Sequence, residues 1–125
     1  MNKYLIFRTD RIGDFLLSAI LIKSIKRNDP DSFIGVIASK KNFDFIKSFK
    51  NIDKVFLYEK SFFSIFKLIK ILKRDKYHSI IIHDSKNRSR IISFFLNKNI
   101  EIFNYNNDKT SYIDIIKQIL NKLNF

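Results

Sequence analysis

Two kinds of hydrophobic pattern alternate along this chain, and their alternation predicts its fold class. Short, continuously apolar runs indicate buried strands, and longer segments with apolar positions at helical spacing indicate helices. The expected strands are residues 4–8, 33–38, 54–58, 79–83 and, more weakly, 100–103. The expected helices are residues 14–27, 42–49, 62–74, 88–96 and 111–123.

The strand-like runs are apolar throughout rather than alternately apolar and polar, which is typical of a parallel sheet covered on both faces. The strand–helix unit recurs about five times, and right-handed crossovers then give a doubly wound arrangement. We therefore expect an α/β fold, a single Rossmann-like domain with a parallel sheet of about five strands. The length of 125 residues fits one domain, residues 1–125.

Composition narrows the function only a little. The formal net charge of +12 permits an anionic partner, although richness in Lys, Ile, Asn and Phe indicates that part of the lysine excess is compositional drift. There is no cysteine, which excludes disulfides and thiolate metal sites and fits a reducing compartment. No secretory signal or membrane-spanning apolar run is present, so we expect a cytoplasmic chain.

The turn after the first expected strand is the best candidate site. It carries the run Arg8-Thr9-Asp10-Arg11-Ile12-Gly13-Asp14, and ligands of α/β proteins bind at the carboxyl ends of the strands. We expect Gly13 to adopt a positive φ and Asp14 to lie at or near the first helical turn. Asp14 is then either a helix cap or an ionised general base, with Arg8 and Arg11 keeping it charged and holding a ligand phosphate.

A second polar segment, residues 83–90, follows the fourth expected strand and should meet the first turn at the same sheet edge. Lys86 and Arg88, near a helix start, would form an anion site, although an exposed loop with solvated charges explains them equally well. His83 has no partner at metal-ligand spacing, so we predict no metal.

Cations also recur three or four residues apart along the expected helix 62–74. A solvated face on a core-packed helix is the commoner explanation, and contact with a membrane surface is the less common one. The chain lacks a glycine-rich dinucleotide motif, a phosphate-binding loop of nucleoside triphosphatases, a nucleophile elbow and any nucleic-acid module, so we predict no bound cofactor.

The first turn and its surroundings resemble the heptosyltransferase-like glycosyltransferases of bacteria, glycosyltransferase family 9. The resemblance rests on Leu5-Ile6-Phe7, Arg8 through Asp14, Leu16-Leu17-Ser18 and Ile22-Lys23-Ser24-Ile25-Lys26. It continues through Asn28-Asp29-Pro30-Asp31, Ile52-Asp53-Lys54-Val55, Lys76-Tyr77 and Arg88-Ser89, nearly the whole chain. Departures fall at Ala19-Ile20, where relatives often carry Thr-Pro, and at Ile82-His83-Asp84 after the fourth strand.

This resemblance implies the N-terminal acceptor lobe of a two-lobed inverting transferase of the GT-B fold. The family's proposed general base matches Asp14, and no metal is needed because cationic groups stabilise the departing diphosphate. The implied donor is a nucleotide-sugar such as ADP-heptose. The implied acceptor is the phosphorylated lipopolysaccharide inner core at the cytoplasmic face of the inner membrane.

The chain matches only the acceptor lobe, so we expect the donor lobe to be absent and the chain alone to be inactive. A separate donor-lobe chain is the implied partner. The alternative is a non-catalytic basic α/β module that binds an anionic partner, either lipid phosphate or nucleic acid. Nucleic acid is the weaker variant, because the aromatic residues look like core positions rather than a stacking surface.

Overall fold

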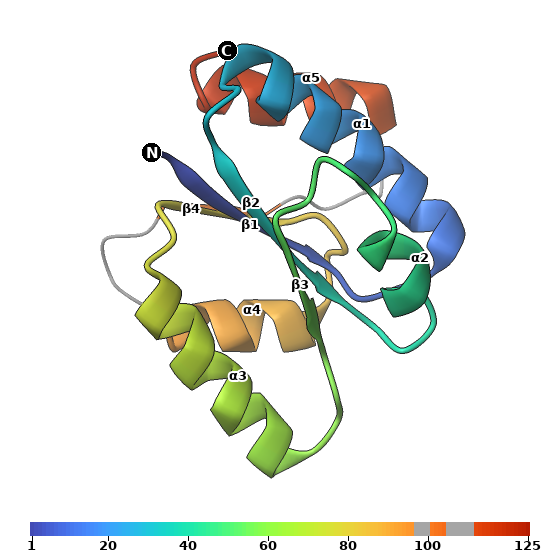
Figure 1. Ribbon diagram of the computed structural model, residues 1–125, viewed down its shortest axis with the longest axis vertical. Coiled ribbons are helices and arrows are strands. Elements are labelled where there is room, and N and C mark those ends of the chain that lie inside the picture. The colour runs from blue at the N-terminus through green and yellow to red at the C-terminus, as the bar shows by residue number, and fades with distance from the viewer. Residues whose placement is uncertain (97–100, 105–111) are drawn as a thin grey trace.

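A five-stranded parallel sheet forms the centre of the computed structural model, which describes residues 1–96, 101–104 and 112–125 (Figure 1). Its strand order is β3-β2-β1-β4-β5. The strands are β1 (Lys3–Arg8), β2 (Phe33–Ala38), β3 (Lys54–Leu57), β4 (Ser79–Ile82) and β5 (Glu101–Asn104). The predicted α/β class, parallel pairing and strand count are confirmed.

Helices cover both faces of this sheet (Figure 1). They are α1 (Ile12–Asn28), α2 (Phe43–Lys47), α3 (Phe62–Asp75), α4 (Asn87–Phe94) and α5 (Tyr112–Lys122). The helices α1 and α5 pack on one face, and α3 and α4 pack on the other. The arrangement is therefore doubly wound, as the pattern of apolar runs predicts.

The central strand β1 explains why the strand-like runs are apolar throughout. Successive side chains of a strand point to opposite faces of the sheet. Ile6 packs into the cluster under α1 and α5, whereas its neighbours Leu5 and Phe7 pack into the cluster under α3 and α4. All three are completely buried, so the middle of β1 is covered by apolar side chains on both faces of the sheet.

Gly35 in β2 is required by a close approach rather than by its backbone conformation. A Cβ atom at this position would lie 2.5 Å from the hydroxyl oxygen of Tyr77, and its backbone has no positive φ. Tyr77 is buried against β2, and burial raises the pKa of its hydroxyl above the ordinary value. A side chain at position 35 would displace this ring.

The start of α1 differs from the expectation. Arg11 occupies the cap position and α1 begins at Ile12. Asp14 therefore lies in the first turn, as expected, but the alternative that it caps the helix is wrong. The predicted positive φ at Gly13 is wrong, because Gly13 is already helical. Ser61 takes the cap position of α3 as a backbone position only, since its side chain makes no capping hydrogen bond. The expected starts at positions 100 and 111 lie outside the described residues.

Candidate functional site

A hollow of about 490 Å³ opens at the carboxyl edge of the sheet, beside the crossing from β1 to β4 where the strand order reverses. It is lined by the segments that follow four different strands. The lining residues are Thr9, Asp10, Arg11, Ser39, Lys40, Lys41, Tyr58, Glu59, Lys60, Lys86 and Arg88. A switch point of this kind is where open α/β sheets bind their ligands.

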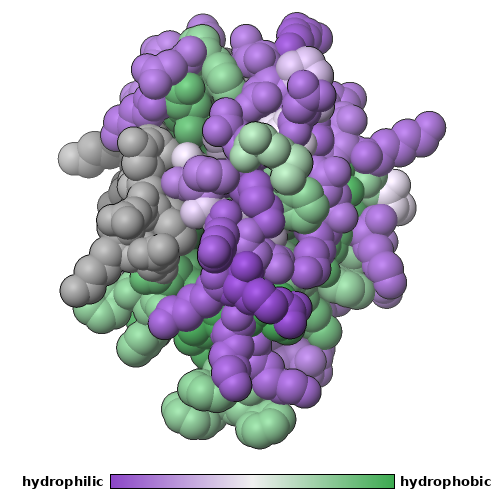
Figure 2. All heavy atoms as spheres, turned by 60° about the vertical axis from the view of Figure 1, so that its left-hand side comes forward, coloured by the Kyte–Doolittle hydropathy of each residue, from purple (hydrophilic) through white to green (hydrophobic). Residues whose placement is uncertain are grey.

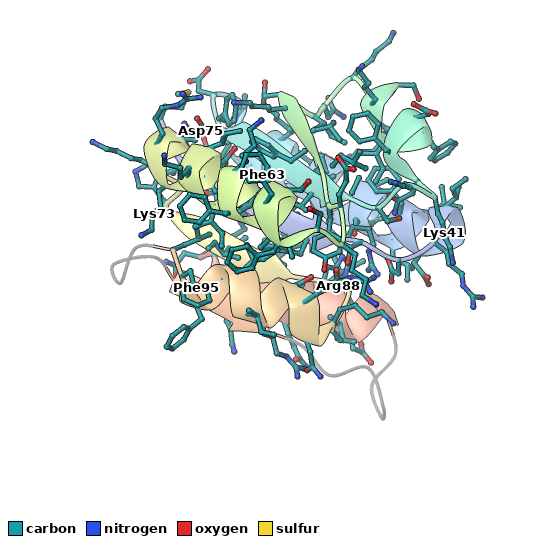
Figure 3. The ribbon with its side chains drawn as sticks, turned by 90° about the horizontal axis from the view of Figure 1, so that it is seen from below. Lys41, Phe63, Lys73, Asp75, Arg88 and Phe95 are labelled. Atoms are coloured by element: carbon teal, nitrogen blue, oxygen red, sulfur yellow. The ribbon has the colours of Figure 1, made fainter. Side chains whose placement is uncertain are left out.

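Positive charge dominates the rim of this hollow. Its cations are Arg11, Lys40, Lys41, Lys60, Lys86 and Arg88, and its only carboxylates among the described residues are Asp10 and Glu59. Figure 3 shows Lys41 and Arg88 at the same end of the molecule, contributed by different segments. An excess of converging cations raises the local concentration of an anionic group, so the hollow suits a phosphorylated or carboxylated ligand.

Asp84 ties the segments after β1 and β4 together beneath the rim. Its Oδ2 accepts hydrogen bonds from the backbone N–H of Thr9 at 2.9 Å, from Thr9 Oγ1 at 2.6 Å and from Ser89 Oγ at 2.8 Å. Its Oδ1 accepts the N–H of Lys86 at 3.1 Å. The residue is only 5% exposed, so this carboxylate is a structural hub rather than a ligand-binding group.

Arg88 is held in place on the same network. Its Nε donates to Thr9 Oγ1 at 2.8 Å, and its Nη2 donates to the carbonyl oxygen of Thr9. The guanidinium also lies over the ring of Tyr58, 5.6 Å from its centroid. The predicted meeting of the two polar segments is thus confirmed, and it gives Arg88 a fixed orientation at the wall of the hollow.

Arg8 takes a different position from the one expected of a phosphate ligand. It is 2% exposed and does not line the hollow. Its Nε donates to Ser18 Oγ at 2.8 Å, and Nη1 contacts Asp10 Oδ2 at 2.8 Å. Arg8 therefore lies buried beneath the hollow, where its guanidinium holds the Asp10 carboxylate in place.

His83 is buried beneath the hollow together with Arg8 and Asp84. Burial lowers the pKa of its imidazole to about 3, and the positive charge of Arg8 adds to the effect. Ser18 Oγ lies 2.7 Å from His83 Nδ1. Ser18 Oγ also accepts the hydrogen bond from Arg8 Nε, so this hydroxyl links the Arg8 guanidinium to the neutral His83 ring.

Asp10 is one of the two carboxylates in the lining of the hollow, the other being Glu59, and the sequence pattern assigns it no role. Burial raises the pKa of Asp10 above its ordinary value; Arg8 opposes this shift, whereas Asp14 and Asp84 add to it. Its Oδ1 is buried without a hydrogen-bond partner among the described residues. Nearby, Ser39 Oγ donates to the Asp10 carbonyl, which joins the segment after β2 to the site.

Asp14 lies half-buried on the first turn of α1, next to the hollow rather than in its wall. It is close enough to Asp10 to raise the pKa of that carboxyl. Gly13 beside it is exposed, and a Cβ there would meet no atom within 4 Å. Position 13 is therefore open space beside Asp14 on the exposed side of the turn.

Three of the predicted binding residues, Arg11, Lys86 and Arg88, line the hollow together. Lys40, Lys41 and Lys60 also line it but were missed. They directly follow β2 and β3, so the rule that ligands gather at strand carboxyl ends would have found them. In the described part of the chain, no three His, Cys, Asp or Glu side chains are grouped to hold a metal ion.

Comparison with known proteins identifies the class of fold. The domain matches glycosyltransferase structures: one of the glycosyl transferase family 9 from Veillonella parvula superposes with a TM-score of 0.72 at 13% identity, over 98% of this chain and 41% of that chain. Escherichia coli heptosyltransferase WaaC with ADP superposes with a TM-score of 0.70 at 11% identity, over 96% of this chain and 46% of that chain. E. coli ADP-heptose lps heptosyltransferase II superposes with a TM-score of 0.63 at 18% identity, over 76% of this chain and 28% of that chain.

These likenesses confirm the expected resemblance at the level of the fold. The chain spans less than half the length of each of these three proteins. No protein-family model matches it, and no curated protein sequence gives a significant match.

Proposed function

We propose that this chain is the N-terminal, acceptor-binding half of an inverting glycosyltransferase. It would serve transfer of a heptose or related sugar from a nucleotide-sugar such as ADP-heptose to the lipopolysaccharide inner core, at the cytoplasmic face of the inner membrane. The observation that carries the proposal is the hollow, where a rim of cations adjoins the turn bearing Asp14. The shared fold with heptosyltransferase structures supports it.

The rim supplies binding of an anionic acceptor. Arg88, held by Thr9 and stacked on Tyr58, presents a fixed guanidinium, whereas the lysines on the opposite wall are exposed and adaptable. Arginine recognises phosphate through a planar fork, and lysine acts as a mobile point charge. Together they would hold a phosphorylated sugar with its hydroxyl turned toward the first turn of α1.

Asp14 would then act as the general base. Its carboxylate takes the proton of the acceptor hydroxyl while the hydroxyl oxygen attacks the anomeric carbon of the donor sugar, and the bond from that carbon to the diphosphate oxygen breaks. The diphosphate leaves with both bonding electrons, and the sugar is transferred with inversion. Cationic side chains stabilise the departing charge without a metal.

The donor site would come from a further polypeptide segment or a second chain. This chain covers 41% of the family 9 structure and 46% of WaaC, so more than half of each of those proteins lies outside the match. We expect negligible transfer by residues 1–125 alone. Transfer should appear when a second polypeptide supplies the donor lobe, and robust turnover of ADP-heptose by the purified chain alone would contradict the two-lobe proposal.

The test is an isosteric replacement in the reconstituted enzyme. Asp14→Asn should lower kcat at least about a hundredfold while leaving acceptor affinity nearly unchanged, because it removes the base and keeps the shape. Asp44→Asn is the matched control, since Asp44 also lies in the first turn of a helix, α2, and is exposed. Equal activity of both variants would refute the role of Asp14.

The cationic hollow also fits the second candidate function, a non-catalytic module that binds an anionic partner. The same variant separates the two. If the protein only binds, Asp14→Asn is nearly silent in every assay, whereas a substitution of a rim lysine still weakens binding. A transferase shows both effects.

A further inference from the structure

Three phenylalanines stand in solvent on the first two turns of α3. Phe62 is 90% exposed, Phe63 69% and Phe66 53%, whereas Leu68 and Leu72 on the same helix are buried against the sheet. Most phenylalanine side chains are largely buried, and exposed apolar clusters on one element mark interaction sites. One side of α3 therefore packs on the core, and its three phenylalanines remain exposed to solvent.

Cations are interleaved with these rings. The Nζ atom of Lys67 lies 5.5 Å from the ring centroid of Phe63, and that of Lys70 lies 5.6 Å from the ring of Phe66. Lys73 and Arg74 continue the series, and residues 60–74 contain no aspartate or glutamate. We call Phe62, Phe63, Phe66, Lys67 and Lys70 the aromatic–basic surface.

The neighbouring helix extends the same layer. Phe94 and Phe95 at the end of α4 are 81% and 53% exposed, and residues 86–95 also lack carboxylates. Figure 3 shows α3 and α4 side by side, with Phe63 and Phe95 labelled on the two helices. Figure 2 shows hydrophobic side chains gathered at the lower end of the molecule, where Figure 1 places the first turn of α3.

We propose that the aromatic–basic surface docks this protein on a lipid bilayer that carries anionic headgroups. Charge complementarity selects this occupant: two carboxylate-free segments place cations around exposed phenylalanines, and an interfacial helix combines these two features. The rings enter the boundary between headgroups and acyl chains, and the lysine ammonium groups contact the headgroup phosphates. An apolar protein partner would instead have to bury these ammonium groups unpaired.

The aromatic–basic surface begins close to the hollow along the chain. Lys60 lines the hollow, and only Ser61 separates it from Phe62 in the sequence. Docking through α3 therefore brings the cationic hollow to the lipid surface. The docking itself needs no catalytic step, so its test is independent of glycosyl transfer. Among the described residues, no helix is both long and apolar enough to cross a membrane.

The experiment is sedimentation of the 125-residue chain with vesicles of phosphatidylcholine, with or without phosphatidylglycerol. We expect binding only to the anionic vesicles. The double variant Phe62→Ser/Phe63→Ser should lower the partition coefficient at least about tenfold. The matched control is Leu16→Ser/Ile20→Ser on α1, whose side chains are 52% and 45% exposed on the opposite face of the sheet. It should bind as the unaltered chain does.

A second variant tests the contribution of the lysine charges to vesicle binding. Lys67→Glu/Lys70→Glu should reduce binding to anionic vesicles at least about tenfold, and added salt should reduce binding of the unaltered chain. Circular dichroism checks that each variant keeps its fold. Equal vesicle binding by the aromatic variant and its α1 control overturns the proposal. So does a dimer of the unaltered chain that Phe62→Ser/Phe63→Ser converts to monomer without changing vesicle binding, since a second copy is then the occupant.

Discussion

The floor and the rim of the hollow are built in opposite ways. The floor consists of buried polar side chains, Arg8, His83 and Asp84, each at most 5% exposed and hydrogen-bonded to a neighbouring segment. The rim consists largely of exposed lysines. Buried polar groups are costly to leave unpaired, whereas exposed charges contribute little to folding. The floor therefore fixes the shape of the site, and the rim is free to bind.

Breaking the floor at its hub should have the largest effect. Asp84→Ala leaves the Thr9 N–H, the Thr9 hydroxyl and the Ser89 hydroxyl without their shared acceptor. We expect the free energy of unfolding to fall by about 3 kcal/mol, measured by urea denaturation. Asp31→Ala, in an exposed loop, is the control and should stay near the original stability. A similar loss in both variants would show that Asp84 is not a hub.

The neutral His83 should make stability depend on pH. Its folded pKa of about 3 lies below the ordinary value of 6.5, so as pH falls below 6.5 the unfolded state takes up a proton that the folded state does not. Unfolding free energy should therefore drop by about 2 kcal/mol between about pH 7.5 and pH 5. His83→Gln should remove this contribution. The control His78→Gln leaves the Ser18–His83 contact intact and should retain it.

The rim should show the reverse behaviour, a change in binding without a change in folding. Lys40→Ala/Lys41→Ala should leave the urea midpoint nearly unchanged and weaken binding of a phosphorylated core oligosaccharide about tenfold, measured by calorimetry. Lys23→Ala/Lys47→Ala alters exposed lysines that do not line the hollow and is the matched control. If both pairs lose the same affinity, only net charge matters and the hollow is not the site.

Gly13→Ala should stabilise the fold slightly, and it tests whether the acceptor approaches over position 13. Gly13 is helical and a Cβ there meets no atom, so alanine should raise the free energy of unfolding, by at most about 1 kcal/mol. The added methyl would lie beside Asp14 on the exposed turn, and it should weaken binding of an acceptor that approaches over position 13. Unchanged binding together with raised stability would indicate that ligand does not approach over Gly13.

Sequence patterns predicted the framework of the molecule well. Continuous apolar runs identify buried parallel strands because both faces of β1 are covered, and Leu5, Ile6 and Phe7 show this directly. The meeting of Thr9 with Asp84 and Arg88 follows from β1 and β4 being adjacent and parallel. Strand pairing thus turned two separate polar segments into one predicted site.

The roles of individual site residues could not be predicted from the sequence, because they depend on which side chains the fold buries. Arg8 looks like a ligand-binding cation in sequence, but as the last residue of β1 it is buried and pairs with Ser18 and Asp10. Asp10 follows β1 by two residues and lines the hollow, but the sequence does not show that its Oδ1 is buried without a hydrogen-bond partner among the described residues. Helix α1 begins two residues before Asp14, so Asp14 lies in the first turn as expected, and Arg11 rather than Asp14 takes the cap position.

Amide chemical shifts of the labelled chain, followed as a phosphorylated inner-core oligosaccharide is added, test the central claim most directly. We predict that the largest changes fall at Arg11, Gly13, Lys41 and Lys86, around one hollow, and vanish when the phosphate groups are removed from the oligosaccharide. Changes confined to α5, or equal changes with the dephosphorylated sugar, would contradict an acceptor site built on this cationic rim.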